Sequence, residues 1–574
     1  MSSKAQAELS RRQFMGAWGS LLAMTALTGD VQGAGLEGSD SSHGSELGDL
    51  TLGSLRAAEN VFGLSLRPED RAQALEGVIR QRERFMARRR RGYLGNDEAP
   101  ANCFDPRLPG QAFRHQENRV HLRASGIPEM PDHDETIAFA PVSHLSAWIR
   151  EQRLSSERLT QIYLDRLRRY DPLLHCVVTL LPEKALKQAR RADQEIASGH
   201  YRGPLHGIPW GAKDLFDTQG DATTWGASPY RSRVADRDAF AVRKLESAGA
   251  VLLVKLTLGA LAMGDVWFDD VTRNPFNPSQ GSSGSSAGSA SATAAGLVGF
   301  SLGTETLGSI VSPCMRCGTT GLRPTFGRVA RSGAMALCWS LDKTGPICRT
   351  VEDTALVLAA INGADEGDPS SVDHGFEFEG RENLQGMRVG YSPRWFEGAE
   401  KELERGVLER VRQLGVELVE VAPLEEDVSH LYTILNVEAS AAFEELTLEG
   451  LDASLVSQGE GAWPNIFRKS WMVPAVEFVQ ADRLRRRVMT KVAAMMNGVD
   501  MLLSPSYAGS LLVATNFTGH PSLTLRAGFR ADGTPTGITL WGDLFEEGKL
   551  CLVGSALEKA LGVWNRQPSL KGGV

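Results

Sequence analysis

Three short segments of this chain carry the amine, hydroxyl and backbone groups that acyl-transfer chemistry requires. The first is 205–214, in which Pro and Gly favour an extended backbone and Lys213 stands at the end of a mostly apolar run. The second is the Gly/Ser turn 284–286, and the third is the segment 303–310, which includes Ser309. We expect these three segments to converge on one site.

The second and third segments lie in one Gly/Ser-rich stretch, Gly281–Pro313. So many glycines and serines disfavour ordinary helix or strand, because Gly costs backbone entropy and Ser competes for backbone hydrogen bonds. Tight turns that bring N–H groups and hydroxyls together suit this composition. A flexible linker is the alternative, but the small apolar residues of 290–302 predict a buried helix and strand.

These segments resemble the amidase signature family. The match comprises the lysine motif His206-Gly207-Ile208-Pro209 to Lys213-Asp214, the serine turn, and Gly303-Thr304-Glu305-Thr306-Leu307-Gly308-Ser309-Ile310. Ser309 follows Ser285 by 24 residues, the spacing of that family. The resemblance continues through 317–329, 340–346 and 516–521 and covers roughly residues 140–565. It implies a large mixed β-sheet covered by helices on both faces, and a similarity to the A-type chain of Glu-tRNA(Gln)/Asp-tRNA(Asn) amidotransferase.

The resemblance assigns a role to each residue of the site. Ser309 matches the nucleophile, Ser285 the middle serine after a cis Gly284–Ser285 peptide, and Lys213 the base. A serine hydroxyl is a poor nucleophile until its proton is taken, and a buried lysine has a lowered pKa that lets it accept one near pH 7. The oxyanion hole is expected from the backbone N–H groups of Thr306, Leu307, Gly308 and Ser309, with Ser286 orienting the relay; no metal or cofactor is implied.

The chain departs from the family pattern at positions that bear on the substrate. Leu307 replaces a glycine, Glu305 replaces an aspartate, and Val311-Ser312 stand where an arginine is common. Ser283 and Ala287 replace glycines beside the middle serine, and the stretch 438–445 lacks the arginine of glutamine-using members. These differences favour a neutral, apolar acyl group over an anionic or glutamine-like one.

Other reactive residues suggest different sites. Lys255 follows a strand and is expected to pair structurally. The segment Ser340-Leu341-Asp342-Lys343-Thr344-Gly345 contains both SxxK and KTG, but a penicillin-binding enzyme needs these motifs on separate elements. His206 and His520 lie inside motifs, yet a Ser–Ser–Lys site does not require a histidine.

Alternating helix and strand patterns predict an α/β fold with one large sheet. The helix at 240–248 and the apolar strand at 250–254 form one such unit, and the pattern recurs at 351–391 and 401–421. We divide the chain into a signal peptide (1–35), a linker (36–47), a helical extension with an irregular arm (48–135) and an amidase signature domain (136–568). Arg11-Arg12 and the apolar stretch after them resemble a twin-arginine export signal.

The composition of the chain disfavours several classes of binding partner. The 574 residues carry a net charge of −8, which disfavours nonspecific nucleic-acid binding. Outside the N-terminus there is no apolar run of 18 residues, so no stable membrane insertion is expected. The seven cysteines show no disulfide framework; Cys314 and Cys317 form a CxxC for which buried thiols are favoured over a disulfide or zinc.

The prediction is therefore an exported, periplasmic or extracellular serine amidase that hydrolyses a small-molecule or peptide-like amide through an acyl-enzyme. Its expected partner is the twin-arginine translocase, and a homodimer is left open. The alternative is a glutamine-hydrolysing A-type chain of a tRNA-dependent amidotransferase. A third hypothesis is an inert binding protein, against which the intact Lys213, Ser285 and Ser309 argue.

Overall fold

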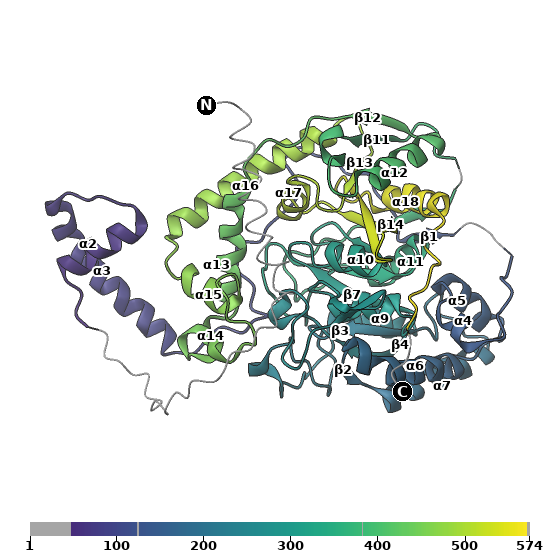
Figure 1. The fold of residues 1–574 in the computed structure, drawn as a ribbon. Helices are drawn as coiled ribbons and strands as arrows, with labels where there is room; N and C mark the ends of the chain where they lie inside the picture. Colours follow the sequence, from purple (N-terminus) through teal and green to yellow (C-terminus); the bar gives the residue numbers. More distant parts are fainter. Residues whose placement is uncertain (1–47, 123–125, 382, 571–574) are drawn as a thin grey trace.

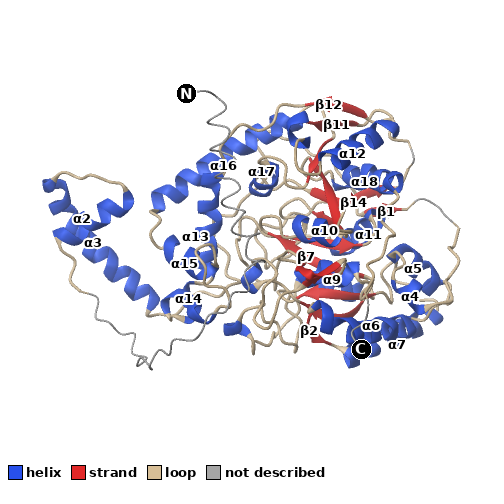
Figure 2. Cartoon of the chain, in the orientation of Figure 1, coloured by secondary structure: helices blue, strands red, loops and turns tan. Residues whose placement is uncertain are grey.

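The computed structural model describes residues 48–122, 126–381 and 383–570. An eleven-stranded sheet crosses the body of the molecule in the order β12-β11-β13-β15-β14-β8-β9-β7-β3-β4-β2 (Figures 1 and 2). Parallel and antiparallel pairs are both present, so the sheet is mixed, as predicted. Its strands are β2 (Val177–Leu180), β3 (Pro209–Lys213), β4 (Val251–Leu256), β7 (Phe300–Glu305), β8 (Thr320–Arg323), β9 (Lys343–Cys348), β11 (Arg388–Tyr391), β12 (Glu417–Glu420), β13 (Met501–Pro505), β14 (Ser522–Phe529) and β15 (Pro535–Gly542).

Helices cover both faces of this sheet. Gly321 of β8 packs against Cys314 of α10, whereas Leu523 of β14 packs against Gly554 of α18 on the opposite face. Successive side chains of a strand point to opposite faces, so the neighbouring pairs Gly321–Thr524 and Leu322–Leu523 face different helices. The helices of the body are α4 (Asp134–Ala138), α5 (Val142–Arg150), α6 (Ser156–Leu174), α7 (Pro182–Ala197), α8 (Phe240–Ser247), α9 (Ala287–Ala294), α10 (Val311–Cys317), α11 (Val351–Ile361), α12 (Lys401–Gln413), α17 (Leu511–Phe517) and α18 (Glu547–Leu561).

A helical subdomain flanks one end of the sheet (Figure 1). A second apolar cluster, separate from the main core, lies between this subdomain and the body. The helices of the subdomain are α13 (Tyr432–Ala442), α14 (Glu444–Leu448), α15 (Trp463–Ser470) and α16 (Ala475–Met496). The smaller elements of the chain are β1 (Arg119–His121), β5 (Arg273–Asn274), β6 (Asn277–Gly281), β10 (Glu377–Glu379), η2 (Ser228–Tyr230), η3 (Ala260–Ala262), η4 (Pro393–Phe396), η5 (Ser429–Leu431) and η6 (Leu451–Ser454).

Two predicted helices of the extension form a hairpin that projects from the body (Figure 1). They are α2 (Leu52–Phe62) and α3 (Pro68–Arg89), and Pro68 occupies the first turn of α3. The C-terminal end of α3 contacts the helical subdomain, where Arg88 pairs with Glu444 at 2.7 Å and Arg89 lies over the Trp471 ring. The predicted signal and linker, 1–47, lie outside the described residues.

One predicted strand boundary is shifted. The apolar pattern predicts a strand at 499–503, but β13 begins at Met501. The preceding residues form a turn that ends α16: the Val499 N–H donates to Met496, and Gly498 has a φ of +84°.

Among the described helices, none is long and apolar enough to cross a membrane.

The sheet topology positions the site. Strands β3 and β7 are parallel neighbours, with Ala212 opposite Leu302. The carboxyl ends of parallel strands meet at the same edge of a sheet, so Lys213 at the end of β3 comes beside Thr304 and Glu305 at the end of β7. The turns that precede α9 and α10 lie at this edge.

Candidate active site

Lys213 is completely buried at the end of β3. Its Nζ donates to Ser285 Oγ at 2.8 Å and to Ser286 Oγ at 3.2 Å. A third contact, at 2.9 Å, reaches Thr304 Oγ1 on the neighbouring strand. Among the described residues, no carboxylate lies within ion-pair distance of this amine. The lysine is therefore surrounded by hydroxyls rather than by a counter-charge.

Burial lowers the pKa of Lys213 from 10.5 to about 7. The charged form loses its hydration in this environment, and the negative charges of Asp342 and Glu305 offset only part of that effect. A lysine with this pKa is partly neutral at physiological pH. It is thus able to accept a proton from a neighbouring hydroxyl.

The serine turn that precedes α9 is tightly packed. The Gly284–Ser285 peptide is cis, as the family resemblance predicts. A side chain at Gly284 would come within 1.8 Å of the Gly264 carbonyl, so only glycine fits there. Ser286 Oγ is in hydrogen-bond contact with both the N–H and the carbonyl of Thr304, which ties the turn to β7.

The buried carboxylate of Glu305 holds the turn that carries Ser309. Glu305 Oε2 accepts the N–H groups of Ile310 and Val311 at 2.8 and 2.9 Å. Its Oε1 accepts from Arg323 at 2.6 Å and from Asn516 at 2.8 Å. Although burial raises its pKa, the Arg323 charge and these hydrogen bonds hold the pKa of Glu305 below its usual value. Glu305 therefore anchors the turn in place of the family's aspartate.

The two turns meet through their backbones. The Ser286 N–H donates to the Ser309 carbonyl at 3.2 Å. The Ser309 side chain lies at the surface of the site, where the residue is 9% exposed. Its hydroxyl makes no hydrogen bond to a described residue, so Ser309 and Ser285 are not hydrogen-bonded to each other in this structure. Catalytic hydrogen bonds often tighten only when substrate binds.

The backbone before Ser309 offers unused donors. The N–H groups of Thr306, Leu307, Gly308 and Ser309 make no hydrogen bonds within the part of the chain that the structure describes. Gly308 has a φ of +88°, a conformation that favours glycine. Thr306 Oγ1 donates to Asp342 at 2.6 Å, which fixes the start of this turn. Free N–H groups in a rigid turn are suited to stabilise an oxyanion.

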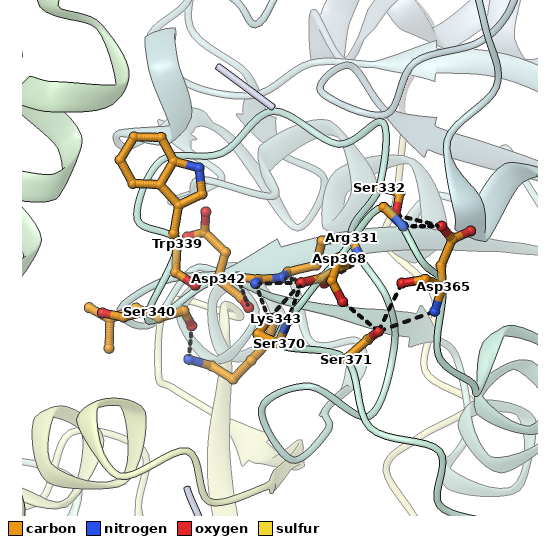
Figure 3. A network of polar contacts seen from close by, with 12 residues as sticks. Arg331, Ser332, Trp339, Ser340, Asp342, Lys343, Asp365, Asp368, Ser370 and Ser371 are labelled. Carbon is orange, nitrogen blue, oxygen red and sulfur yellow. Dashed lines mark hydrogen bonds and ion pairs between the residues drawn. The ribbon is translucent and has the colours of Figure 1, made fainter. Parts of the chain in front are cut away.

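A cavity of about 370 Å³ opens beside these residues. Its lining includes Thr306 and Thr304, of which Thr304 contacts the Lys213 amine, but not Lys213, Ser285 or Ser309 themselves. Its remaining wall comes mostly from the loop 331–344 and from the segment 365–369, with Asp97 and Ala99 contributed by the N-terminal arm. Figure 3 shows the polar network that supports part of this wall.

The other reactive residues make separate contacts. Lys255 Nζ pairs with Asp214 at 3.0 Å, the structural pairing that the sequence predicts. The Ser340 hydroxyl contacts Glu438 at 2.6 Å, whereas Lys343 donates to the Leu341 carbonyl, so the SxxK motif does not form a serine–lysine pair. His206 lies against Glu195, and His520 against Thr518.

Cys314 and Cys317 are both free and buried. Burial raises the pKa of the Cys314 thiol to about 12, which makes it a poor nucleophile at neutral pH. No group of three or more His, Cys, Asp or Glu side chains is placed to hold a metal ion within the described ranges.

Three contributors to the site are not predicted by the sequence patterns. Thr304 contacts the lysine amine, although its place in the motif just before Glu305 gives no sign of that contact. Asn516 lies in a segment that matches the family, but its contact with Glu305 joins two distant segments. Asp342 accepts from Thr306, whereas the sequence places it in the family segment 340–346 and in the SxxK alternative without indicating this contact.

Comparisons with known proteins agree with this geometry. A profile of the family described as Amidase matches residues 158–511. The chain is 32% identical over 478 residues to the A-type chain of the glutamyl-tRNA(Gln) amidotransferase of Methylococcus capsulatus, covering 75% of this chain and 98% of that protein. The native peptide amidase of Stenotrophomonas maltophilia superposes with a TM-score of 0.69 at 30% identity, over 75% of this chain and 99% of that one. An amidase family protein from Bacillus anthracis also gives 0.69, at 27% identity, over 76% of this chain and 94% of that one.

The fold, the buried lysine beside paired serine turns and these comparisons lead to one class: the chain belongs to the amidase family. It is an amidohydrolase that acts on linear amide C–N bonds.

Proposed function

We propose that the protein is a serine amidase in which Ser309 is the nucleophile, Ser285 the proton relay and Lys213 the base. One observation carries this proposal: a buried lysine with a pKa near 7 donates to Ser285 in a cis turn whose backbone contacts the Ser309 turn. Unused N–H groups at 306–309 complete the arrangement.

In the acylation step, Ser309 Oγ attacks the amide carbonyl carbon. Its proton passes to Ser285 Oγ while the Ser285 proton passes to neutral Lys213. The carbonyl oxygen becomes negative and is stabilised by the N–H groups of 306–309, each typically contributing about 2.7–4 kcal/mol. The same relay then returns the proton to the departing nitrogen, the C–N bond breaks, and an acyl-enzyme on Ser309 remains.

Deacylation repeats the sequence with water. Ser285 takes a proton from water and transfers its own to Lys213, and the resulting hydroxide equivalent attacks the acyl carbon. The proton returns to Ser309 Oγ as the ester bond breaks, which releases a carboxylic acid. The net reaction adds one water across the amide bond.

Leu307 supports a neutral, apolar acyl group. It packs against the second apolar cluster, which lies between the nucleophile turn and the helical subdomain. Burying a charged acyl group against such side chains would be costly. The cluster comprises Cys338, Leu341, Val428, Leu431, Ile434, Leu435, Ala481, Val488, Val492, Val513, Ala514 and Phe517.

Replacing Leu307 with glycine tests this acyl preference. We expect Leu307→Gly to lower kcat/KM for hexanamide roughly tenfold, because an apolar contact worth about 1–3 kcal/mol is lost. The ratio of kcat/KM for a bulkier acyl group to that for hexanamide should rise. The matched control is Leu451→Gly on the exposed surface. An unchanged ratio would refute the role of Leu307.

Glutamine hydrolysis is the second candidate function, favoured by the amidotransferase relative from Methylococcus capsulatus. The two functions are separated by a panel of neutral aliphatic, aryl and peptide amides assayed beside glutamine, with and without the other chains of an amidotransferase. We expect turnover of the neutral amides by the chain alone. Turnover of glutamine that requires those other chains would favour the alternative instead.

We also propose that the protein is exported by the twin-arginine route, on the basis of Arg11-Arg12 and the apolar segment 17–28. Cells that express the full chain should carry amidase activity in the periplasmic or extracellular fraction. The double substitution Arg11→Lys/Arg12→Lys should retain that activity in the cytosol, whereas Arg90→Lys/Arg91→Lys should not. Equal distribution of all three proteins would contradict export by this route.

A further inference from the structure

The cavity beside the site is lined by Thr304, whose hydroxyl contacts Lys213 Nζ at 2.9 Å. Its role in substrate binding rests on the proposed function, in which Lys213 and Ser285 return a proton to the leaving nitrogen. That nitrogen must therefore lie within reach of the lysine relay. A substituent on the leaving nitrogen is thus within reach of this cavity.

The charged side chains of the cavity wall are already paired. Arg331 makes contacts of 3.0 and 3.1 Å with the two oxygens of Asp368, and it also donates to the Trp339 carbonyl (Figure 3). Burial raises the pKa of Asp368, but the charge and hydrogen bonds of the Arg331 guanidinium together oppose this effect and lower the pKa to about 2. The outer pairs are Arg243 with Asp365 and Arg237 with Asp97.

The fourth carboxylate, Asp342, is also occupied. It accepts the Thr306 hydroxyl and the N–H groups of Leu337 and Cys338. An anionic substituent in the cavity would therefore find no unpaired cation among the described residues of its wall, and a cationic one would have to compete with the hydrogen bonds that Asp342 already accepts. The rest of the wall is largely apolar, with Leu215, Ala262, Ala334, Met335, Leu337 and Trp339.

One side-chain hydroxyl of the wall is unpaired among the described residues. Thr344 is 1% exposed and lines the cavity, and its Oγ1 has no hydrogen-bond partner among the described residues. It stands directly opposite Thr304 across the β7–β9 pair, on the same face of the sheet. Buried hydroxyls in proteins are normally hydrogen-bonded. A ligand atom in the cavity would supply the missing partner.

The outer wall comes from the N-terminal arm. The Asn96 side chain exchanges two 2.8 Å hydrogen bonds with the backbone of Ala336, and the Asn96 backbone carbonyl accepts from Trp339 Nε1 at 3.3 Å. Asp97 and Ala99 then line the cavity. These residues lie outside the segment 158–511 that the family profile matches. The arm thus reaches the cavity from outside the segment that the family profile matches.

We propose that residues 96–99 complete a subsite for the amine part of the substrate. The subsite takes an amide whose nitrogen substituent is uncharged, largely apolar and equipped with one polar atom that hydrogen-bonds Thr344. Thr344 and Asn96 are specificity-determining residues of the reaction, and they act on acylation alone because the amine has departed before deacylation.

Three substrates with the same acyl group test the proposal: hexanamide, hexanoyl 4-nitroanilide and N-hexanoylglycine. We expect Thr344→Val to lower kcat/KM for the nitroanilide about tenfold, the usual contribution of one hydrogen bond. Thr344→Ser should restore the value, and hexanamide should be unaffected. N-hexanoylglycine, whose amine carries a carboxylate, should be a poor substrate of the unmodified enzyme.

Asn96→Ala should raise KM for the nitroanilide several-fold and leave hexanamide unchanged. The matched arm control is Arg107→Ala, because Arg107 pairs with the neighbouring Asp105 at 2.8 Å and does not line the cavity. An equal loss on hexanamide, a changed deacylation rate, or no effect of Thr344→Val on the nitroanilide would overturn the subsite.

Fluorophosphonate labelling distinguishes failure of the subsite from failure of the proposed function, because the probe carries no amine. A chain that neither labels nor turns over hexanamide would refute the proposed function itself.

Discussion

Ser309→Ala should abolish labelling by a fluorophosphonate probe and lower amide turnover by about 10⁴–10⁶-fold. In the proposed mechanism the hydroxyl supplies the atom that becomes acylated, and no other described serine combines the unused N–H groups of 306–309 with the neighbouring Lys213–Ser285 pair. The probe forms a covalent bond to the nucleophile, so intact-mass spectrometry reads out the result directly. Turnover of the best amide from the panel provides the second measurement.

Ser312→Ala is the matched control, because Ser312 lies just after the same turn and its hydroxyl contacts Ser283. This variant should label normally. Labelling of Ser309→Ala at the unmodified rate would place the nucleophile elsewhere, and the role of the whole turn would then be wrong.

Lys213→Met should lower kcat/KM by about 10²–10⁴-fold, the usual contribution of general acid–base catalysis. Methionine has a similar length and fits a buried position, but it cannot accept the Ser285 proton. Lys213→Arg should fail as well, because a guanidinium stays protonated at every accessible pH. Lys244→Met, at a site away from the three segments, is the control for loss of a lysine.

If Lys213 is the base, kcat/KM should rise with pH. With the pKa of Lys213 at about 7, the neutral base accumulates as pH rises. We expect kcat/KM to increase about tenfold per unit below pH 7 and to level off above about pH 8. The residual activity of Lys213→Met should lack this acid limb. An unchanged limb in that variant would assign the titration to another group.

Much of the site was predictable from the sequence because its parts are local. The turns at 284–286 and 303–309 each consist of consecutive residues whose types specify a close backbone approach, as Gly284 and Gly308 illustrate. The helix–strand unit predicted at 351–391 begins with the helix α11, which occupies 351–361. Periodic apolar patterns of this length are strong signals because they report which side of one element is buried.

The supports of the site were not predictable in the same way. Glu305 and Asn516 are 211 positions apart, and Asn96 and Ala336 are 240 apart. Both pairs depend on the tertiary fold, which places α17 beside the end of β7 and the N-terminal arm beside the loop at 336–339. No local sequence pattern indicates such a pairing, because a polar loop residue has the same sequence context with or without a distant partner.

The sequence by itself determined the class of chemistry: a lysine at the end of an apolar strand and two glycine-bounded serine turns with the family's spacing. The tertiary structure decided whether those groups can work together. Burial of Lys213 lowers its pKa, Glu305 and Arg323 hold the Ser309 turn, and the arm lines a cavity in whose described wall the Thr344 hydroxyl is unpaired. The physical reason is that desolvation and hydrogen-bond pairing depend on everything around a side chain, and most of those surroundings come from distant parts of the chain.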